Sequence, residues 1–180
     1  MAKAGRLCGA AVAAAAMTAL SVTNSAAAET TRGESTEVSP DQYCVYDLST
    51  KSAQCSAREE VADRIVSRVA SDALVKAWGK PNYRGRWIVF HAGTDIRDEC
   101  AGGGLVAKIS NLRDFYRHLP KGQTWNNRIS SLKPLNGCAV MLFGRKNLQG
   151  ANTDWLPYRE PRLGRLPTGW NNAATSLLFG

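Results

Sequence analysis

Histidine is scarce in this sequence, which restricts the chemistry the chain can perform. Only His91 and His118 occur among 180 residues, and neither lies in a recognised catalytic or zinc-binding pattern such as His-Glu-x-x-His. Catalysis would require a nucleophile with its base, a metal cage or a pair of tuned carboxylates. The acidic cluster within residues 95–99 contains Arg97 and is typical of a solvated loop. We therefore predict a protein that is not an enzyme, with no catalytic residues and no required cofactor.

The sequence also lacks an apolar run of the roughly 20 residues that cross a membrane. Its longest apolar run, residues 7–20, follows Lys3 and Arg6 and precedes a small-residue cleavage site at 26–28. This order of basic, apolar and small residues is typical of a signal peptide. We predict that residues 1–28 are removed and that the mature protein is secreted, extracellular, soluble and without a membrane partner.

The chain has no extreme charge. Lys and Arg number 23 and Asp and Glu 15, a formal charge of +8. Loss of Lys3 and Arg6 would leave 21 basic residues against 15 acidic ones, or +6. The basic stretch of Arg159, Arg162 and Arg165 could attract nucleic acid or an acidic cell-surface polymer. Because the protein is predicted to be exported, we favour a solvated loop, no nucleic-acid partner and a monomer.

Four cysteines remain after the predicted signal peptide, namely Cys44, Cys55, Cys100 and Cys138. An even number of cysteines in an oxidising compartment is typical of disulfide-bonded proteins. Four cysteines allow three pairings. We favour a local Cys44–Cys55 disulfide and a Cys100–Cys138 disulfide that joins the two halves of the chain.

The segment after the predicted signal peptide is polar. Residues 29–42 have almost no apolar side chains to bury, and we predict a flexible linker there. The β-favouring residues 43–46 and the polar stretch 47–54 then lead round to Cys55. This order predicts a hairpin or loop closed by a disulfide, which together with one helix occupies residues 43–72.

The helix is predicted from residue 56 to residue 71 or 72. Residues 56–59, Ser-Ala-Arg-Glu, match a capping box, and Val61, Ile65 and Val69 follow at spacings of four. The apolar face that this spacing creates must pack on something. We expect the helix to lie as a lid on a β domain, with binding of a partner as the alternative.

An internal repeat organises residues 73–180. Residues 78–85, Trp-Gly-Lys-Pro-Asn-Tyr-Arg-Gly, align with residues 143–150, Phe-Gly-Arg-Lys-Asn-Leu-Gln-Gly. Farther along, residues 125–131, Trp-Asn-Asn-Arg-Ile-Ser-Ser, align with residues 170–176, Trp-Asn-Asn-Ala-Ala-Thr-Ser. Each copy is predicted to contain a strand, a tight turn from an aromatic residue to a glycine, a second strand, a long connection and a closing turn and strand.

We name residues 73–134 motif one and residues 135–180 motif two. Gly85 and Gly150 are predicted to adopt positive φ, which glycine tolerates at little steric cost. Motif one carries an insertion over residues 92–107 that we expect to be a surface loop. The predicted core is aromatic and consists of Trp78, Trp87, Phe90, Trp125, Phe143, Trp155 and Trp170.

The repeated pattern resembles the βγ-crystallin motif, two copies of which make one domain. The whole chain, with its signal peptide and a cysteine-containing segment before two motifs, resembles small secreted actinobacterial proteins of peptidase inhibitor family I36. This resemblance implies an all-β, two-motif Greek-key sandwich that inhibits a secreted protease, of metalloprotease type. It assigns no inhibitory loop, and the insertion around Cys100 is only a candidate.

The resemblance to βγ-crystallins also implies calcium ligands exchanged between the two motifs. The candidates are the side chains of Asn127 and Asn172, the hydroxyls of Ser130 and Thr175, and the main-chain carbonyls of Arg128 and Ala173. Because the acidic-or-amide positions are all Asn, the charge of the ion is uncompensated and binding is expected to be weak. In the alternative, these side chains only hydrogen-bond the closing turns. A calcium-binding extracellular structural or binding module is thus our alternative to the inhibitor.

Overall fold

The computed structural model describes residues 42–94, 99–100, 103–114 and 124–180. The predicted signal peptide and all but the last residue of the predicted linker lie outside the described residues. Within the described part, no helix has the length and apolar character needed to span a membrane.

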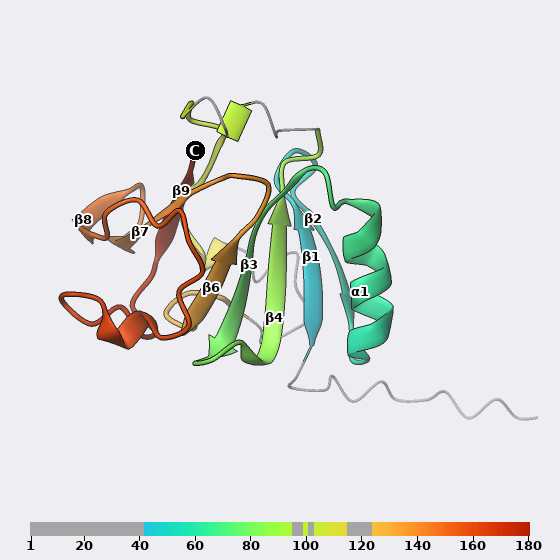
Figure 1. The fold of residues 1–180 in the computed structure, drawn as a ribbon, viewed down its shortest axis with the longest axis horizontal. Coiled ribbons are helices and arrows are strands. Elements are labelled where there is room, and N and C mark those ends of the chain that lie inside the picture. The colour runs from blue at the N-terminus through green and yellow to red at the C-terminus, as the bar shows by residue number, and fades with distance from the viewer. Residues whose placement is uncertain (1–41, 95–98, 101–102, 115–123) are drawn as a thin grey trace, which may run out of the picture. The chain divides into compact units, whose positions relative to one another are not determined.

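Two β-sheets form the described domain (Figure 1). In spatial order, the first sheet contains β2 (Ser52–Ser56), β1 (Tyr43–Asp47), β4 (Arg84–His91), β3 (Ala73–Lys80) and β6 (Ser131–Pro134). The second sheet contains β5 (Ala107–Ile109), β9 (Ser176–Phe179), β7 (Val140–Arg145) and β8 (Gln149–Asn152). Neighbouring strands are antiparallel except β1 and β4, which are parallel.

The two motifs exchange segments between the sheets. Strand β5 belongs to motif one but pairs with β9 of motif two in the second sheet. In return, Glu160 of motif two forms an isolated bridge with Leu132 of β6 in the first sheet. A strand that leaves its own sheet in this way produces a Greek-key connection. The predicted all-β, two-motif, βγ-crystallin-like sandwich is therefore confirmed, with one helix and an N-terminal disulfide.

The main core lies between the sheets, where Phe90 of β4 meets Phe179 of β9 with ring centroids 6.2 Å apart. Six of the seven predicted core aromatics are buried. Trp155 is the exception, because it is 38% exposed. The next residue, Leu156, packs against the core and pairs with Val140. Since successive residues of an extended chain face opposite sides, Trp155 is turned outward.

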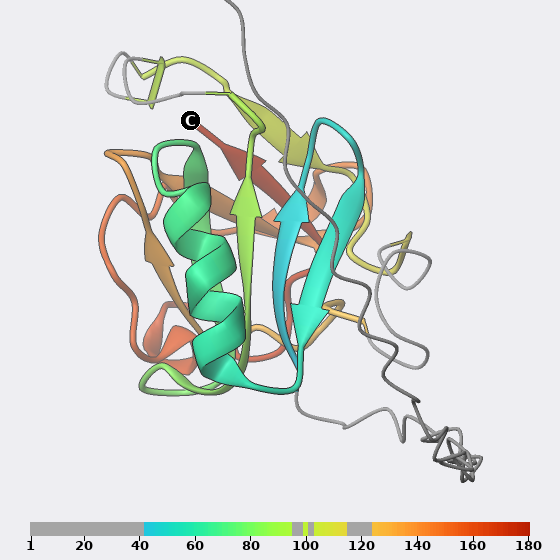
Figure 2. The ribbon, with the colours of Figure 1, turned by 90° about the vertical axis from the view of Figure 1, so that its right-hand side faces the viewer.

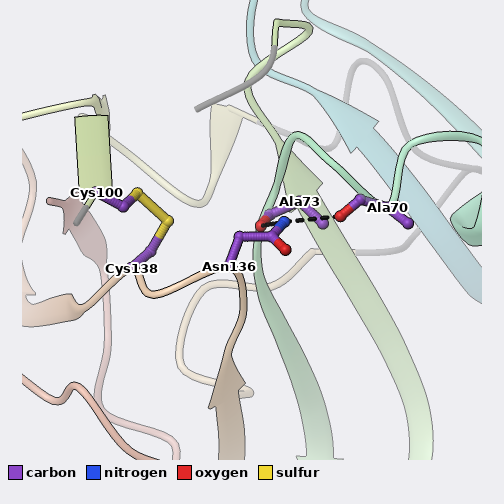
Figure 3. Close-up of a disulfide and its surroundings, with 5 residues drawn as sticks. All are labelled: Ala70, Ala73, Cys100, Asn136 and Cys138. Atoms are coloured by element: carbon purple, nitrogen blue, oxygen red, sulfur yellow. Dashed lines mark hydrogen bonds between the residues drawn. A yellow bond between two sulfur atoms is a disulfide. The ribbon is translucent and has the colours of Figure 1, made fainter. Parts of the chain in front are cut away.

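The predicted disulfide hairpin forms from β1 and β2, with Cys44 opposite Cys55 and bonded to it. The second predicted disulfide, Cys100–Cys138, is also present (Figure 3). The hairpin does more than close a loop, because β1 pairs with β4 and extends the first sheet. Sequence reasoning did not predict this parallel pairing.

Helix α1 (Glu59–Arg68) covers the face of the first sheet opposite the second sheet (Figure 2). Ala62 is buried there against Trp87, and Ile65 and Val66 pack beside it. The predicted lid is therefore confirmed, although the helix is shorter at both ends than predicted.

The predicted capping box is wrong. The hydroxyl of Ser56 accepts a hydrogen bond from the Arg58 amide at 3.0 Å, and the helix begins after Arg58 without a side-chain cap. Glu59, the acidic residue of the predicted box, instead accepts a hydrogen bond from Trp87 Nε1 at 2.8 Å. The carboxylate therefore fastens the helix to the sheet rather than capping the helix.

Candidate functional site

The turns that join β3 to β4 and β7 to β8 have the same backbone shape. In the first turn φ is 58° at Asn82, 58° at Tyr83 and 75° at Gly85. The equivalent positions in the second turn have φ values of 59°, 57° and 79°, ending at Gly150. The predicted positive φ at both glycines is confirmed, and the sequence repeat corresponds to a structural one.

The last serine of each Asn-Asn-x-x-Ser/Thr-Ser block fastens the folded turn of its own motif. Ser131 Oγ donates to the carbonyl of Lys80 at 2.8 Å and accepts from the amide of Tyr83 at 3.1 Å. In motif two, Ser176 Oγ donates to the carbonyl of Arg145 at 2.6 Å and accepts from the amide of Leu148 at 3.0 Å. Sequence reasoning gave these two serines no role.

The other side chains of the two blocks meet across the motif boundary. Ser130 Oγ of motif one lies 3.0 Å from Asn172 Oδ1 of motif two and 3.2 Å from the carbonyl oxygen of Gly79. We call these three groups, with the neighbouring Arg128 carbonyl, the first cluster. In the second cluster, Thr175 Oγ1 of motif two donates to Asn127 Oδ1 of motif one at 3.4 Å.

Backbone contacts support the same exchange. The amide of Asn127 donates to the carbonyl of Ala174, and that of Asn172 donates to the carbonyl of Ile129, each at 2.9 Å. Ala173, the remaining candidate ligand, follows in the closing turn of motif two, where its amide donates to Trp170. The structure thus brings Ser130 together with Asn172, and Thr175 together with Asn127, as the exchanged pattern requires.

The donor set fits a calcium ion in kind and spacing. Calcium takes oxygen ligands at about 2.3–2.6 Å, so neighbouring ligand oxygens lie about 3 Å apart. The oxygen pairs of the two clusters are 3.0 and 3.4 Å apart, a spacing that the hydrogen bonds between them also produce. No carboxylate contributes to these pairs, and the described residues contain no group of three or more His, Cys, Asp or Glu side chains placed so that they could hold a metal ion. The spacing of the oxygen atoms is therefore compatible with calcium, whereas the lack of negatively charged ligands disfavours it.

A cavity of about 630 Å³ lies beside the first cluster. Its polar lining includes Thr124, Asn126, Asn127 and Asn172. Its charged lining consists of three cations, Lys80, Arg86 and Arg128, and no acidic residue lines it in the described part of the chain. These cations oppose calcium binding most at the first cluster, because Gly79, Arg128 and Asn172 of that cluster line the cavity, against Asn127 alone from the second.

The residues predicted to be solvated or structural are not part of the two clusters. His91 is buried, with Nδ1 3.2 Å from Asp72 Oδ2, so it serves the packing of β4. His118, Asp95 and Asp98 lie outside the described residues. Glu99 is exposed, as are the three arginines of the stretch 159–165.

The insertion in motif one returns to the domain at two fixed points. Cys100 is bonded to Cys138 (Figure 3), and the amide of Val106 donates to the carbonyl of Phe179 at 2.9 Å. Between these points Leu105 is 72% exposed. Residues 93–94, 99 and 103–105 of the insertion are exposed, as predicted, and present one large apolar side chain, whereas Cys100 is buried and Ala107 belongs to β5.

Asn136 holds the junction of the two motifs. Its side-chain amide donates to the carbonyls of Ala70, after α1, and Ala73, at the start of β3, at 2.7 and 2.9 Å (Figure 3). Asn136 itself has a φ of 52°, which asparagine tolerates better than most residues. An Asn-Gly pair between two predicted strands was the signal that could have identified this turn.

No protein-family model and no curated protein matches this sequence. Among solved structures, the N-terminal domain of protein S is 18% identical with a TM-score of 0.41, and the match covers 60% of this chain and 96% of that one. A βγ-crystallin domain from Flavobacterium johnsoniae is 22% identical with a TM-score of 0.40, covering 59% and 93%. Protein S in complex with calcium is 22% identical with a TM-score of 0.40, covering 61% and 49%.

Proposed function

We propose that this chain is a secreted, monomeric, non-enzymatic module that binds calcium weakly at the two clusters exchanged between its motifs. The observation that carries this proposal is the pairing of Ser130 with Asn172 and of Thr175 with Asn127, each across the motif boundary. Two disulfides in one small domain are what an oxidising, extracellular compartment favours.

The two clusters are unequal in their electrostatics. Motif two carries Ala151 and Ala173 where motif one carries Arg86 and Arg128. Like charges near a cation site disfavour the bound ion, and more strongly where water is partly excluded. We therefore expect the second cluster, at Thr175, to bind calcium more tightly than the first.

Calorimetry on the mature chain tests this proposal. Calcium should bind in the millimolar range and raise the melting temperature, because a ligand specific for the native state stabilises it. Thr175→Ala should remove the tighter site, Ser130→Ala the weaker one, and the exposed control Thr94→Ala neither. An absence of binding heat, with a melting temperature unchanged by millimolar calcium, would refute the proposal.

Inhibition of a secreted peptidase is the second candidate function, and the exposed Leu105 favours it. A side chain held out on a segment that is fixed at both ends loses little entropy on binding. The Cys100–Cys138 disulfide and the Val106 hydrogen bond supply those fixed points. Apolar side chains of this size fill the specificity pockets of many proteases.

The test uses a panel of thermolysin-like and serine proteases with the mature chain at micromolar concentration. Inhibition that falls in Leu105→Ser and persists in Tyr158→Ser would support the candidate, since Tyr158 is 81% exposed on a different loop. Failure of the chain to slow any protease of the panel, or equal effects of the two variants, would exclude Leu105 as the contact.

A further inference from the structure

We propose that the cavity beside the first cluster is a binding site for an acidic saccharide, a sugar that carries a carboxylate or a sulfate. The cavity has a volume of about 630 Å³, within the range of small-ligand sites and sufficient for one or two sugar rings. This inference goes beyond calcium binding and does not depend on it, because the cations of the cavity wall carry it, although Asn127 and Asn172 belong both to the cavity wall and to the two clusters.

The internal repeat shows that the fold does not need these cations. Arg86 and Arg128 line the cavity, whereas the equivalent positions in motif two are the alanines Ala151 and Ala173. The two motifs nevertheless have the same turn geometry and the same serine fastening. The fold therefore accepts alanine at both positions. The two arginines add positive charge to motif one alone, and both of them line the cavity.

The guanidinium group of Arg86 is held in position. Its Nη2 donates to the carbonyl of Thr124 at 3.2 Å, and the group stacks on the ring of Trp125 with a centroid distance of 5.1 Å. A planar guanidinium presents several donors in a fixed geometry that suits carboxylate and sulfate groups. Arg86 therefore contributes an oriented cation to the wall of the cavity.

Lys80 and Arg128 supply further positive charge. Within the described part of the chain, neither of these side chains forms an ion pair with a carboxylate. Both are exposed, so an arriving anion would not have to break a buried contact. No acidic residue of the described part of the chain lines the cavity, so Lys80 and Arg128, beside the oriented Arg86, favour an anion over a cation there.

The amide and hydroxyl groups of the cavity match the rest of a sugar. Asparagine side chains donate and accept hydrogen bonds at the same time, as sugar hydroxyls do. Asn127 and Asn172 are exposed at the cavity, and Asn126 is buried with its Oδ1 lacking a partner among the described groups. A simple inorganic anion would contact the cations but would not need hydrogen bonds from these amides.

The test is an NMR titration of the mature chain in metal-free buffer with glucuronate, glucose 6-sulfate and neutral glucose. We expect the two acidic sugars to shift the amide signals of the cavity residues, with millimolar dissociation constants that rise with salt. Arg128→Ala and Lys80→Ala should each weaken binding about tenfold, as for the loss of one charge-assisted contact. Arg145→Ala, the equivalent of Lys80 in motif two, should not.

The melting temperature of each variant should show that the variant folds. We expect both single variants to fold, because Lys80 and Arg128 are exposed. The proposal is overturned if glucose binds as well as glucuronate, if inorganic sulfate binds as tightly as the acidic sugars, or if the double variant of Lys80 and Arg128 binds unchanged. Because the titration buffer contains no metal, such a result does not bear on the calcium proposal.

Discussion

Replacing Ser131 by alanine should lower the free energy of unfolding by about 2 kcal/mol. The hydroxyl of Ser131 is fully buried and makes two hydrogen bonds, to the Lys80 carbonyl at 2.8 Å and from the Tyr83 amide at 3.1 Å. Each backbone group left without a partner costs about 1–3 kcal/mol when buried. Water can reach this partly exposed turn, so we take the lower end of that range for each group.

Chemical denaturation of the mature chain measures this loss, and the melting temperature should fall by about 4–8 °C for a domain of this size. Ser176→Ala should repeat the effect, since Ser176 makes the equivalent bonds in motif two. Ser67→Ala is the control, because Ser67 is exposed on α1 and its hydroxyl donates to the carbonyl of Arg64 in the same helix. A loss below about 0.5 kcal/mol for Ser131→Ala, no larger than a surface substitution, would refute the reasoning.

Three further predictions concern charge, pH and the disulfides. Arg128→Ala removes a cation from the first cluster and should strengthen calcium binding there in calorimetry, whereas weaker binding would contradict the charge argument. Burial alone would raise the pKa of Asp47, but hydrogen bonds from Ser49 and Thr50 outweigh burial and lower this pKa to about 2. Asp47 therefore stabilises the folded state at pH values above its ordinary pKa of about 4, and this contribution is lost as the pH falls toward 2. The contribution is below about 1 kcal/mol, because the carboxylate is largely exposed to solvent. Acid unfolding of Asp47→Asn should lack this loss. Removing the Cys100–Cys138 disulfide, with a sequence separation of 38, should cost about 4 kcal/mol, against about 3 kcal/mol for the hairpin disulfide with a separation of 11.

The parts of the fold that could be predicted are those specified by nearby residues. Asn82, Tyr83 and Gly85 adopt positive φ within four consecutive positions, and a turn of this kind is determined by its own residues. The hairpin disulfide joins residues on adjacent strands with a short polar connection between them. Both features are encoded locally, so the sequence pattern was sufficient.

The features that were missed depend on partners far away in the chain. Glu59 looks like the acidic residue of a capping box, but its carboxylate is taken by Trp87, 28 positions later. The parallel pairing of β1 with β4 joins residues more than 40 positions apart, and nothing in the local pattern of either strand selects it. A local propensity gives way when a tertiary contact satisfies the same group better.

The sequence pointed to the residues that meet at the motif boundary but not to their surroundings, and their role as calcium ligands stays a prediction. The sequence identified Asn127, Ser130, Asn172 and Thr175, and their exchange across the motifs followed from the resemblance. Which cations face the first cluster could not be predicted, because Arg86 reaches the cavity from β4 and is separated from Arg128 by 42 positions. Alignment of the two motifs did contain a signal, since both arginines align with alanines.

Comparison of the two motifs separates the needs of the fold from those of function. A residue that is the same in both copies and makes the same bonds, such as Ser131 and Ser176, is required by the turn. A residue that differs while the backbone is unchanged is not required by it, and Arg128 beside Ala173 is such a case. Exchanging these two residues between the motifs should therefore take one positive charge away from the cavity and weaken its preference for acidic sugars, while leaving the free energy of unfolding within about 0.5 kcal/mol. A large loss of stability on that exchange would instead make Arg128 a residue of the fold.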